Sequence, residues 1–272
     1  MTELKYKFTN DVLFRILFTN NTDLLKKLVA DLLVIPFDNI TEFVITNPDV
    51  PPEVMGEKYC RLDINMIVDG RRTNLEVQVQ NEGNYPERSL YYWAREFSSS
   101  LGEGEDYIDL PQTIIISIID FKLFDCTEFH SEFQTLEVSR HEPLTDKMSL
   151  HYFELPKLPK SISKDDTMKL WLALFNAKTE EELKQFENMG VSIMEQAVTA
   201  YRKVTATEEF KEIERIRSRA RHDEAAALRN ARNKEKIDIA KRLLRRNRSI
   251  DEIVEDTGLT KEEVEKLRDA DN

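Results

Sequence analysis

The sequence predicts an α/β fold with a mixed sheet over about the first 160 residues, followed by an all-helical region. Three observations support this prediction: β-hairpin alternation at 58–80, a nearly continuous β-branched run at 112–121, and apolar residues at helical spacing in 9–34 and 86–101. A sheet that is apolar on both faces needs cover on both sides. We therefore expect the two amphipathic helices to pack against the faces of one sheet.

The first helix is expected at 9–34, with Thr9 or Asn10 as its N-cap. Nine apolar residues carry its helical spacing: Val12, Leu13, Ile16, Leu17, Leu24, Leu25, Leu28, Leu32 and Leu33. Pro36 ends the helix, and Asp11 lies in the first turn, where a carboxylate complements the helix dipole. A strand near 40–47 and the proline-rich loop NPDVPPE follow.

The stretch KYCRLDINMIVDGRRTNLEVQVQ, from Lys58 to Gln80, alternates as two strands of a hairpin. The apolar side of the first strand holds Cys60, Leu62, Ile64, Met66 and Val68, and its polar side Arg61, Asp63 and Asn65. The apolar side of the second holds Leu75, Val77 and Val79, and its polar side Asn74, Glu76, Gln78 and Gln80. Asp69 and Gly70 form the turn, because both tolerate positive φ better than most residues.

Two registers are open for this hairpin. If Asp69 and Gly70 are the whole loop, paired residue numbers sum to 139 and Asp63 faces Glu76. A four-residue loop over 69–72 gives a sum of 141 and places Asp63 opposite Gln78. In both registers the three side chains share one face. Two carboxylates about 5 Å apart repel, so a cation between them or a raised pKa is expected.

A helix at 86–101 follows, with Pro86 at its first position. Its expected buried stripe is Leu90, Trp93, Ala94, Phe97 and Leu101. Another face carries Arg88, Tyr92, Arg95 and Ser99. The two arginines either bind phosphate or pair with acidic groups, which are Glu87, Glu96 and the Glu76 side of the sheet.

The rest of the chain changes from strands to helices. A strand pair is expected at 129–138 and 147–155, and PKLPK at 156–160 marks a boundary. Helices are expected at 165–176, 179–188 and 191–203, and a long charged helix from 207 to about 246. The predicted organisation is a domain at 1–160, a helical region at 161–205, a long basic helix at 206–248 and a tail at 249–272.

Charge is unevenly distributed along the 272 residues, whose net charge is −12. Residues 1–200 carry 20 Lys and Arg against 34 Asp and Glu, whereas residues 201–248 carry 16 against 8. A basic segment beside an acidic core suits a nucleic-acid contact, although a charged, solvated helix gives the same count. We expect KRLLRRNR at 241–248, with Arg245, Arg246 and Arg248, to bind phosphates.

The tail at 249–272 predicts a helix-turn-helix-like module. Ser249 and Thr260 are expected N-caps, and Thr257-Gly258-Leu259 is the connection. The second helix, KEEVEKLR, is acidic, whereas a recognition helix needs donors to bases and phosphates. A structural or protein-contact role is therefore favoured over DNA reading.

Several classes of protein are disfavoured. The chain begins without an apolar signal core and has no run of about 18 apolar residues, so no membrane association and a cytoplasmic location are expected. Its two cysteines lack framework spacing, which is typical of reduced thiols. The four histidines lack metal-ligand spacing, which disfavours a zinc site.

Asp63 followed by Glu76-x-Gln78 resembles the core of PD-(D/E)XK nucleases. In more detail, the chain resembles the Rpn family of recombination-promoting nucleases and transposases. The matching segments are NDVLFRILF, RLDINMIVDGRRTNLEVQVQ, RSLYYWAREF, GEDYIDLPQTIIISIIDFKLF and HYFELPKL, so the resemblance covers about residues 7–158. It implies a restriction-endonuclease-like αβββαβ core, and a nuclease-like domain at 1–160.

The resemblance also implies a site for Mg²⁺ or another divalent cation. Asp63, Glu76 and the backbone carbonyl of Val77 would be its ligands, with Asp11 as an additional acidic candidate beside its helix-dipole role. Gln78 would orient a water, although many members of the superfamily have Lys there. Lys58 and Arg61 are the candidates for the missing cation.

Three functions remain open at this point. The first is a Mg²⁺-dependent DNA endonuclease associated with recombination or DNA mobility, with Asp63, Glu76 and Gln78 as catalytic residues. The second is a DNA-binding or regulatory protein on the same fold with weak or no cleavage, favoured by Gln78 and the acidic core. The third is a protein-interaction module assembled through the long helix. DNA is the expected partner, and both a monomer and a homo-oligomer stay open.

Overall fold

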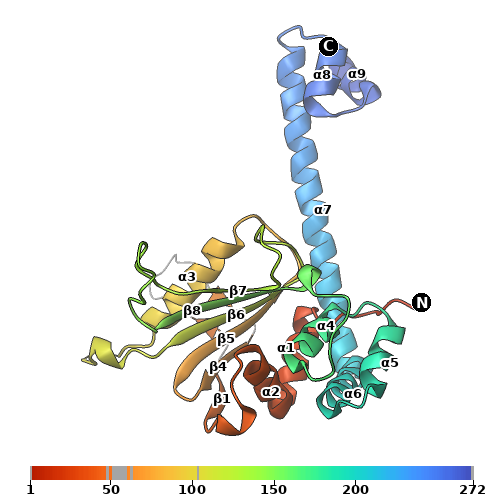
Figure 1. Cartoon of the computed structure of the whole chain (residues 1–272). Coiled ribbons are helices and arrows are strands. Elements are labelled where there is room, and N and C mark those ends of the chain that lie inside the picture. The colour runs from red at the N-terminus through yellow and green to blue at the C-terminus, as the bar shows by residue number, and fades with distance from the viewer. Residues whose placement is uncertain (1, 47–48, 51–59, 62–63, 103, 271–272) are drawn as a thin grey trace. The chain divides into compact units, whose positions relative to one another are not determined.

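The computed structural model describes residues 2–46, 49–50, 60–61, 64–102 and 104–270. The chain divides into two compact units, Met1–Phe210 and Lys211–Asn272 (Figure 1). The first unit extends past the predicted boundary at residue 160. No helix among the described residues has the length and apolar character that a membrane span requires.

The first unit is built on a six-stranded sheet with the order β1-β4-β5-β6-β8-β7. The strands are β1 (Phe43–Thr46), β4 (Ile64–Val68), β5 (Arg71–Gln78), β6 (Thr113–Ile119), β7 (His130–Phe133) and β8 (Met148–Glu154). β5, β6 and β8 are parallel, and the remaining pairs are antiparallel. A separate pair joins β2 (Asp49–Val50) to β3 (Cys60–Arg61), so the prediction of Cys60 and Arg61 in the first hairpin strand is wrong. The predicted mixed sheet is confirmed.

The hairpin between β4 and β5 has the two-residue loop. Val68 pairs with Arg71 and Ile64 with Leu75, so paired numbers sum to 139, and the four-residue alternative is wrong. Asp69 has a φ of 48° and Gly70 a φ of 73°, both in the left-handed region. The Asp69 carboxylate accepts the backbone N–H groups of Glu42 and Thr41, each at 2.9 Å, which fixes the turn against the residues before β1.

The first helical segment is two helices, α1 (Asp11–Asn20) and α2 (Thr22–Leu32), instead of the single helix predicted at 9–34. The break is at Asn21, whose φ of −131° is not helical. Its side-chain amide donates to the carbonyl of Leu17 at 2.6 Å and so satisfies an acceptor at the end of α1. The sequence Asn20-Asn21-Thr22 favours such local bonds over a continuous helix.

The later helices of this unit pack against α1 and the chain before it. They are α4 (Thr167–Asn176), α5 (Glu180–Asn188) and α6 (Ser192–Ala206). Phe18 of α1 stacks on Phe175 of α4 with ring centroids 5.9 Å apart, and Phe8 stacks on Tyr201 of α6 at 4.8 Å. These helices gather on the side of the sheet away from α3 (Figure 1). Short 3₁₀ helices lie at η1 (Phe37–Asn39), η2 (Tyr107–Asp109) and η3 (Leu155–Lys157).

Helix α3 (Tyr85–Ser98) covers the other face of the sheet through a partly polar side. Its buried residues are Tyr85, Ser89 and Glu96, whereas Leu90 is 47% exposed. The predicted apolar stripe is therefore wrong at Leu90 and at Ala94, which is also exposed. The cause lies in the sheet, which presents polar groups to α3: Glu96 pairs with Arg72 of β5 at 3.0 Å.

The second unit contains most of α7 (Glu208–Leu244), with α8 (Ile250–Thr257) and α9 (Lys261–Ala270). A small core of Ala240, Ile253, Leu259 and Val264 joins the three helices. Ser249 and Glu252 form a capping box, and Gly258 ends α8 with a φ of 64°. The predicted helix-turn-helix-like connection is thus present in the structure.

Candidate active site

The polar side of β5 faces α3. Glu76 pairs across the sheet with Ser117 of β6, and Asn74 pairs with Ile115, which packs in the same cluster as Tyr85 of α3. Asn74 is fully buried and Glu76 is only 7% exposed. A buried carboxylate carries a large desolvation cost unless hydrogen bonds or a cation compensate it. Glu76 is therefore a buried carboxylate of β5 whose charge needs compensation from hydrogen bonds or a cation.

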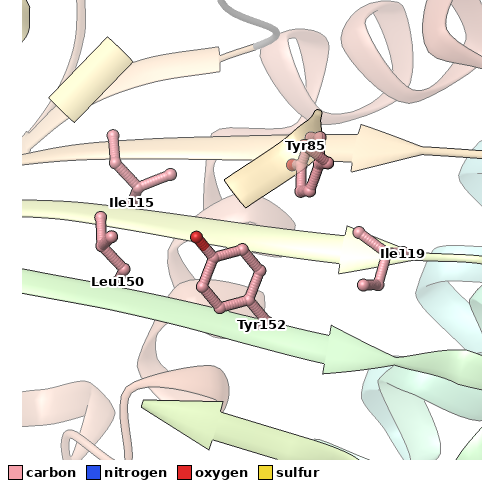
Figure 2. Packing of buried hydrophobic residues seen from close by; sticks show 5 residues of the cluster. All are labelled: Tyr85, Ile115, Ile119, Leu150 and Tyr152. Atoms are coloured by element: carbon pink, nitrogen blue, oxygen red, sulfur yellow. The ribbon is translucent and has the colours of Figure 1, made fainter. Parts of the chain in front are cut away.

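Tyr85 contacts the Glu76 carboxylate directly. The Tyr85 hydroxyl donates to Glu76 Oε2 at 3.3 Å. Burial, followed by the negative charge of Glu76, raises the pKa of Tyr85 well above its usual range, so the phenol stays protonated and can donate. The ring packs in a cluster with Ile115, Ile119, Leu150 and Tyr152 (Figure 2).

Further polar atoms lie on this face of the sheet. The Asn74 amide donates to the Ile64 carbonyl at 3.3 Å and to Asn65 Oδ1 at 3.1 Å. Asn74 Oδ1 and Ser117 Oγ are buried and have no hydrogen-bond partner among the described residues. Oxygen atoms with spare acceptor capacity beside a carboxylate suit a hard cation and the waters that such a cation retains. The donor atoms present here thus fit a divalent metal.

Gln78 and Val77 complete this end of β5. Gln78 is half-buried on the same face as Glu76, and its amide nitrogen donates to the Gln80 carbonyl at 2.9 Å. That bond turns the amide group toward the chain after β5. The Val77 side chain lies on the opposite face because side chains alternate along a strand.

Arg88 of α3 lies beside this site. The Arg88 guanidinium carbon is 4.9 Å from the centroid of the Tyr85 ring, and Nη1 is 3.3 Å from Glu82 Oε2. Glu82 is largely exposed, so this ion pair contributes little to stability. Arg95 and Tyr92 are half-buried on the same helix and also make contacts. Arg72 of β5, which was not predicted as a site residue, is the arginine that pairs with Glu96.

Other predicted site residues lie elsewhere or outside the described residues. Asp63 and Lys58 fall outside the described ranges, as does the side chain of Arg61. Asp11 is in the first turn of α1, where Oδ1 accepts the Val12 N–H at 3.0 Å, so its predicted helix-start position is confirmed. Among the described residues, no group of three or more His, Cys, Asp and Glu side chains is arranged to hold a metal.

The three arginines predicted to bind phosphates are exposed and follow α7. Arg245, Arg246 and Arg248 lie on or beside the turn that leads to α8. Arg248 Nη1 is 3.5 Å from Glu252 Oε1, a solvent-exposed pair. Exposed guanidinium groups are available to phosphates at small energetic cost. The role of these three arginines stays a prediction.

A hydrogen-bonded cluster that was not predicted from the sequence lies at the β7–β8 edge. His130 Nε2 is 3.1 Å from His151 Nδ1, and Ser149 Oγ is 2.8 Å from His151 Nε2 and donates to Glu132 Oε1 at 3.0 Å. Burial lowers the pKa of His151 to about 4 and also lowers that of His130. The cluster forms only across the strand pair, where Glu132 faces His151. Its sequence signal was the polar alternation of His130 with Glu132 and of Ser149 with His151.

Comparisons with known proteins agree with this architecture. The model of the family described as PD-(D/E)XK nuclease family transposase matches residues 8–231. Searches of the curated proteins and of the solved structures found no significant match. The match spans α1, the whole six-stranded sheet, α3 and much of α7. On the evidence of this match, and of the mixed sheet with its buried Glu76, the chain belongs to the PD-(D/E)XK nuclease family transposases.

Proposed function

We propose that this chain is a divalent-metal-dependent DNA endonuclease that acts in recombination or DNA mobility. The observation that carries the proposal is the buried Glu76 carboxylate on the polar face of β5, under α3. Family membership supplies the nuclease-like chemistry in general terms. The metal, the substrate and the individual residues are assigned here as our proposal.

Asp63, Glu76 and the carbonyl of Val77 would hold the cation, for which Mg²⁺ is the expected identity. When bound, such a cation lowers the pKa of a water and offsets charge on the scissile phosphate. Gln78 would position the attacking water through its amide group. Asp11 stays an additional candidate ligand, with its Oδ1 bonded to the Val12 N–H at the start of α1.

Arginines would supply the positive charge that the acidic first 200 residues lack. Arg88 and Arg95, with Tyr92 between them on α3, would meet the phosphates next to Glu76. Arg245, Arg246 and Arg248 of the second unit would bind DNA backbone without reading sequence. DNA is thus the partner, and a second copy of the chain would provide the second active site for cutting both strands.

The test is cleavage of supercoiled plasmid by purified wild-type protein and two variants, with Mg²⁺ and with EDTA. Glu76→Gln removes the charge and keeps a hydrogen-bond acceptor for Tyr85, whereas Glu96→Gln removes another buried carboxylate of the same sheet–helix interface. We expect metal-dependent nicking that Glu76→Gln reduces by about 100- to 1,000-fold, as for loss of one charge-stabilising group, and that Glu96→Gln retains. Equal trace activity in wild type and Glu76→Gln would identify contamination and reject the proposal.

One observation favours a second candidate, a DNA-binding protein with weak or no cleavage. The position that many members of the superfamily fill with Lys is Gln78 here, and its amide nitrogen is bound to the Gln80 carbonyl. A neutral amide cannot offset anionic charge at the phosphate. Salt-dependent DNA binding without metal-stimulated cleavage would support this candidate over the endonuclease.

A further inference from the structure

We propose that Tyr85 is a positioning residue that orients the Glu76 carboxylate for metal binding. The inference rests on the proposed function and adds a residue outside the Asp63, Glu76 and Gln78 set. Its basis is the hydrogen bond from the Tyr85 hydroxyl to Glu76 Oε2 at 3.3 Å, between side chains that are 1% and 7% exposed. A hydrogen bond from a fixed donor already holds the carboxylate in one orientation. Less rotational freedom is then lost when the metal binds, which favours binding.

The Tyr85 ring has little freedom to move. It is the first residue of α3, and Pro86, whose φ is restricted, follows it. Its ring meets Phe121 edge-on at a centroid distance of 6.0 Å and Tyr152 at 6.2 Å. Figure 2 shows the Tyr85 ring over the sheet between Ile115 and Ile119 of β6 along the strand direction. The hydroxyl is therefore placed by packing from several elements.

Arg88 adds a second constraint on the same ring. Its guanidinium carbon lies 4.9 Å from the ring centroid, within the range of a cation–π contact. Arg88 is three residues after Tyr85 and thus on the same side of α3. A phosphate contact by Arg88 and metal binding by Glu76 would therefore share one neighbour, the Tyr85 ring.

The chain offers a matched control in Tyr152. This tyrosine is 3% exposed, lies in the same cluster and pairs its hydroxyl with Ser89 Oγ at 2.5 Å, a neutral group. If the bond to Glu76 serves only to give the buried Tyr85 hydroxyl a hydrogen-bond partner, removal of either tyrosine hydroxyl should affect metal affinity alike. If Tyr85 orients Glu76, only the change at Tyr85 alters metal affinity.

The experiment measures Mn²⁺ binding to the full chain by isothermal titration calorimetry, with the Mg²⁺ dependence of plasmid cleavage beside it. Tyr85→Phe is expected to weaken Mn²⁺ binding about 10- to 100-fold, as losing a partner of a metal ligand typically does. It should raise the Mg²⁺ concentration for half-maximal cleavage by a similar factor, with most of the maximal rate kept at saturating Mg²⁺. Tyr152→Phe should leave Mn²⁺ affinity within about threefold of wild type, since its hydroxyl does not touch Glu76.

The results separate the two proposals. Unchanged Mn²⁺ affinity in Tyr85→Phe, or equal weakening in Tyr152→Phe, overturns the positioning role while the endonuclease proposal stands. Wild type that binds no Mn²⁺, or Glu76→Gln that binds it as tightly as wild type, overturns both. Should Tyr85→Phe not fold, Tyr85→p-aminophenylalanine keeps the ring and a weaker donor. It is expected to weaken Mn²⁺ binding by a smaller factor, and no weakening overturns the role.

Discussion

Val34 has a left-handed backbone conformation, with a φ of 55°, just after the end of α2. Glycine is the usual residue at such a helix end, because a β-branched side chain crowds the backbone there. The conformation is held by the neighbouring Ile35 N–H, which donates to the Ala30 carbonyl at 2.8 Å. The Val34 side chain is 76% exposed, so it gains little from packing.

Replacing Val34 by glycine should therefore stabilise the protein. The left-handed conformation costs a branched residue roughly 1–2 kcal/mol, and glycine loses about 0.5–1 kcal/mol more chain entropy on folding. We expect a net gain of about 1 kcal/mol in the free energy of unfolding, measured by urea denaturation. Val138→Gly is the matched control, because Val138 is 88% exposed and has no positive φ. A loss of stability in Val34→Gly equal to that in Val138→Gly would contradict the strain argument.

At the scale of elements, the edge strand β7 is attached to β8 through a titratable cluster. His130, Glu132, Ser149 and His151 form one hydrogen-bonded chain across the antiparallel pair. The bonds are satisfied when both histidines are neutral, since one imidazole then donates to the other. A proton on each would place two positive charges on ring nitrogens 3.1 Å apart, and Glu132 is the acidic group of the described residues that offsets them.

Acid should accordingly weaken the fold at this edge. Burial lowers the pKa of His151 to about 4 in the folded chain, against about 6.5 in the unfolded one, so the unfolded chain binds more protons between these values. Stability from this group is present above pH 6.5 and is lost as the pH falls toward 4, by roughly 3 kcal/mol at most. The lowered pKa of Glu132 acts in the same direction at still lower pH.

Urea denaturation at pH 7.5, 5.5 and 4.5 measures this dependence. His151→Gln should flatten the loss of stability between pH 7.5 and 4.5, because it removes the group with the strongly lowered pKa. His222→Gln, at an exposed position of α7, should leave the curve unchanged. If both variants keep the wild-type pH dependence, the β7–β8 cluster is not its origin.

At the scale of the whole molecule, two units carry different parts of the proposed function. The first contains the Glu76 site and is acidic in sequence; the second contains the basic turn after α7 and a small core of its own. The proposal assigns chemistry to the first and sequence-independent DNA affinity to the second. Changes in the two units should thus affect different measured quantities.

Replacing Arg245, Arg246 and Arg248 by alanine should weaken DNA binding and reduce its salt dependence. Each phosphate contact contributes about 0.9 to the slope of log affinity against log salt, so the slope should fall by up to about 2.7. The cleavage rate at saturating DNA should stay near wild type. The control replaces Lys261, Lys266 and Arg268 of α9, the same number of charges on the acidic helix. An equal loss in both variants would show a general charge effect and no phosphate contacts at the turn.

Much of the fold followed from the sequence because local patterns determined it. Alternation predicted the two hairpin strands over 64–68 and 71–78, although Cys60 and Arg61 pair with β2 in a separate sheet. Asp69-Gly70 predicted the turn, since few residues accept its positive φ. The β-branched run at 112–121 indicated a buried strand, and Ser249 and Thr260 marked helix starts that the structure has. Two features predict Glu76 as a site residue: its place on the polar face of a strand, and the resemblance of its motif to the nuclease core.

Tertiary structure decided what depends on contacts between distant segments. It selected the hairpin register in which paired residue numbers sum to 139. It buried the side of α3 that carries Tyr85 and left Leu90 exposed. It divided the first predicted helix at Asn21. It also brought Tyr85 to Glu76 and His130 to His151, pairs separated along the chain by 9 and 21 residues. Alternation and helical spacing report which side of an element is apolar, whereas the partner across the interface determines which polar groups can be buried there.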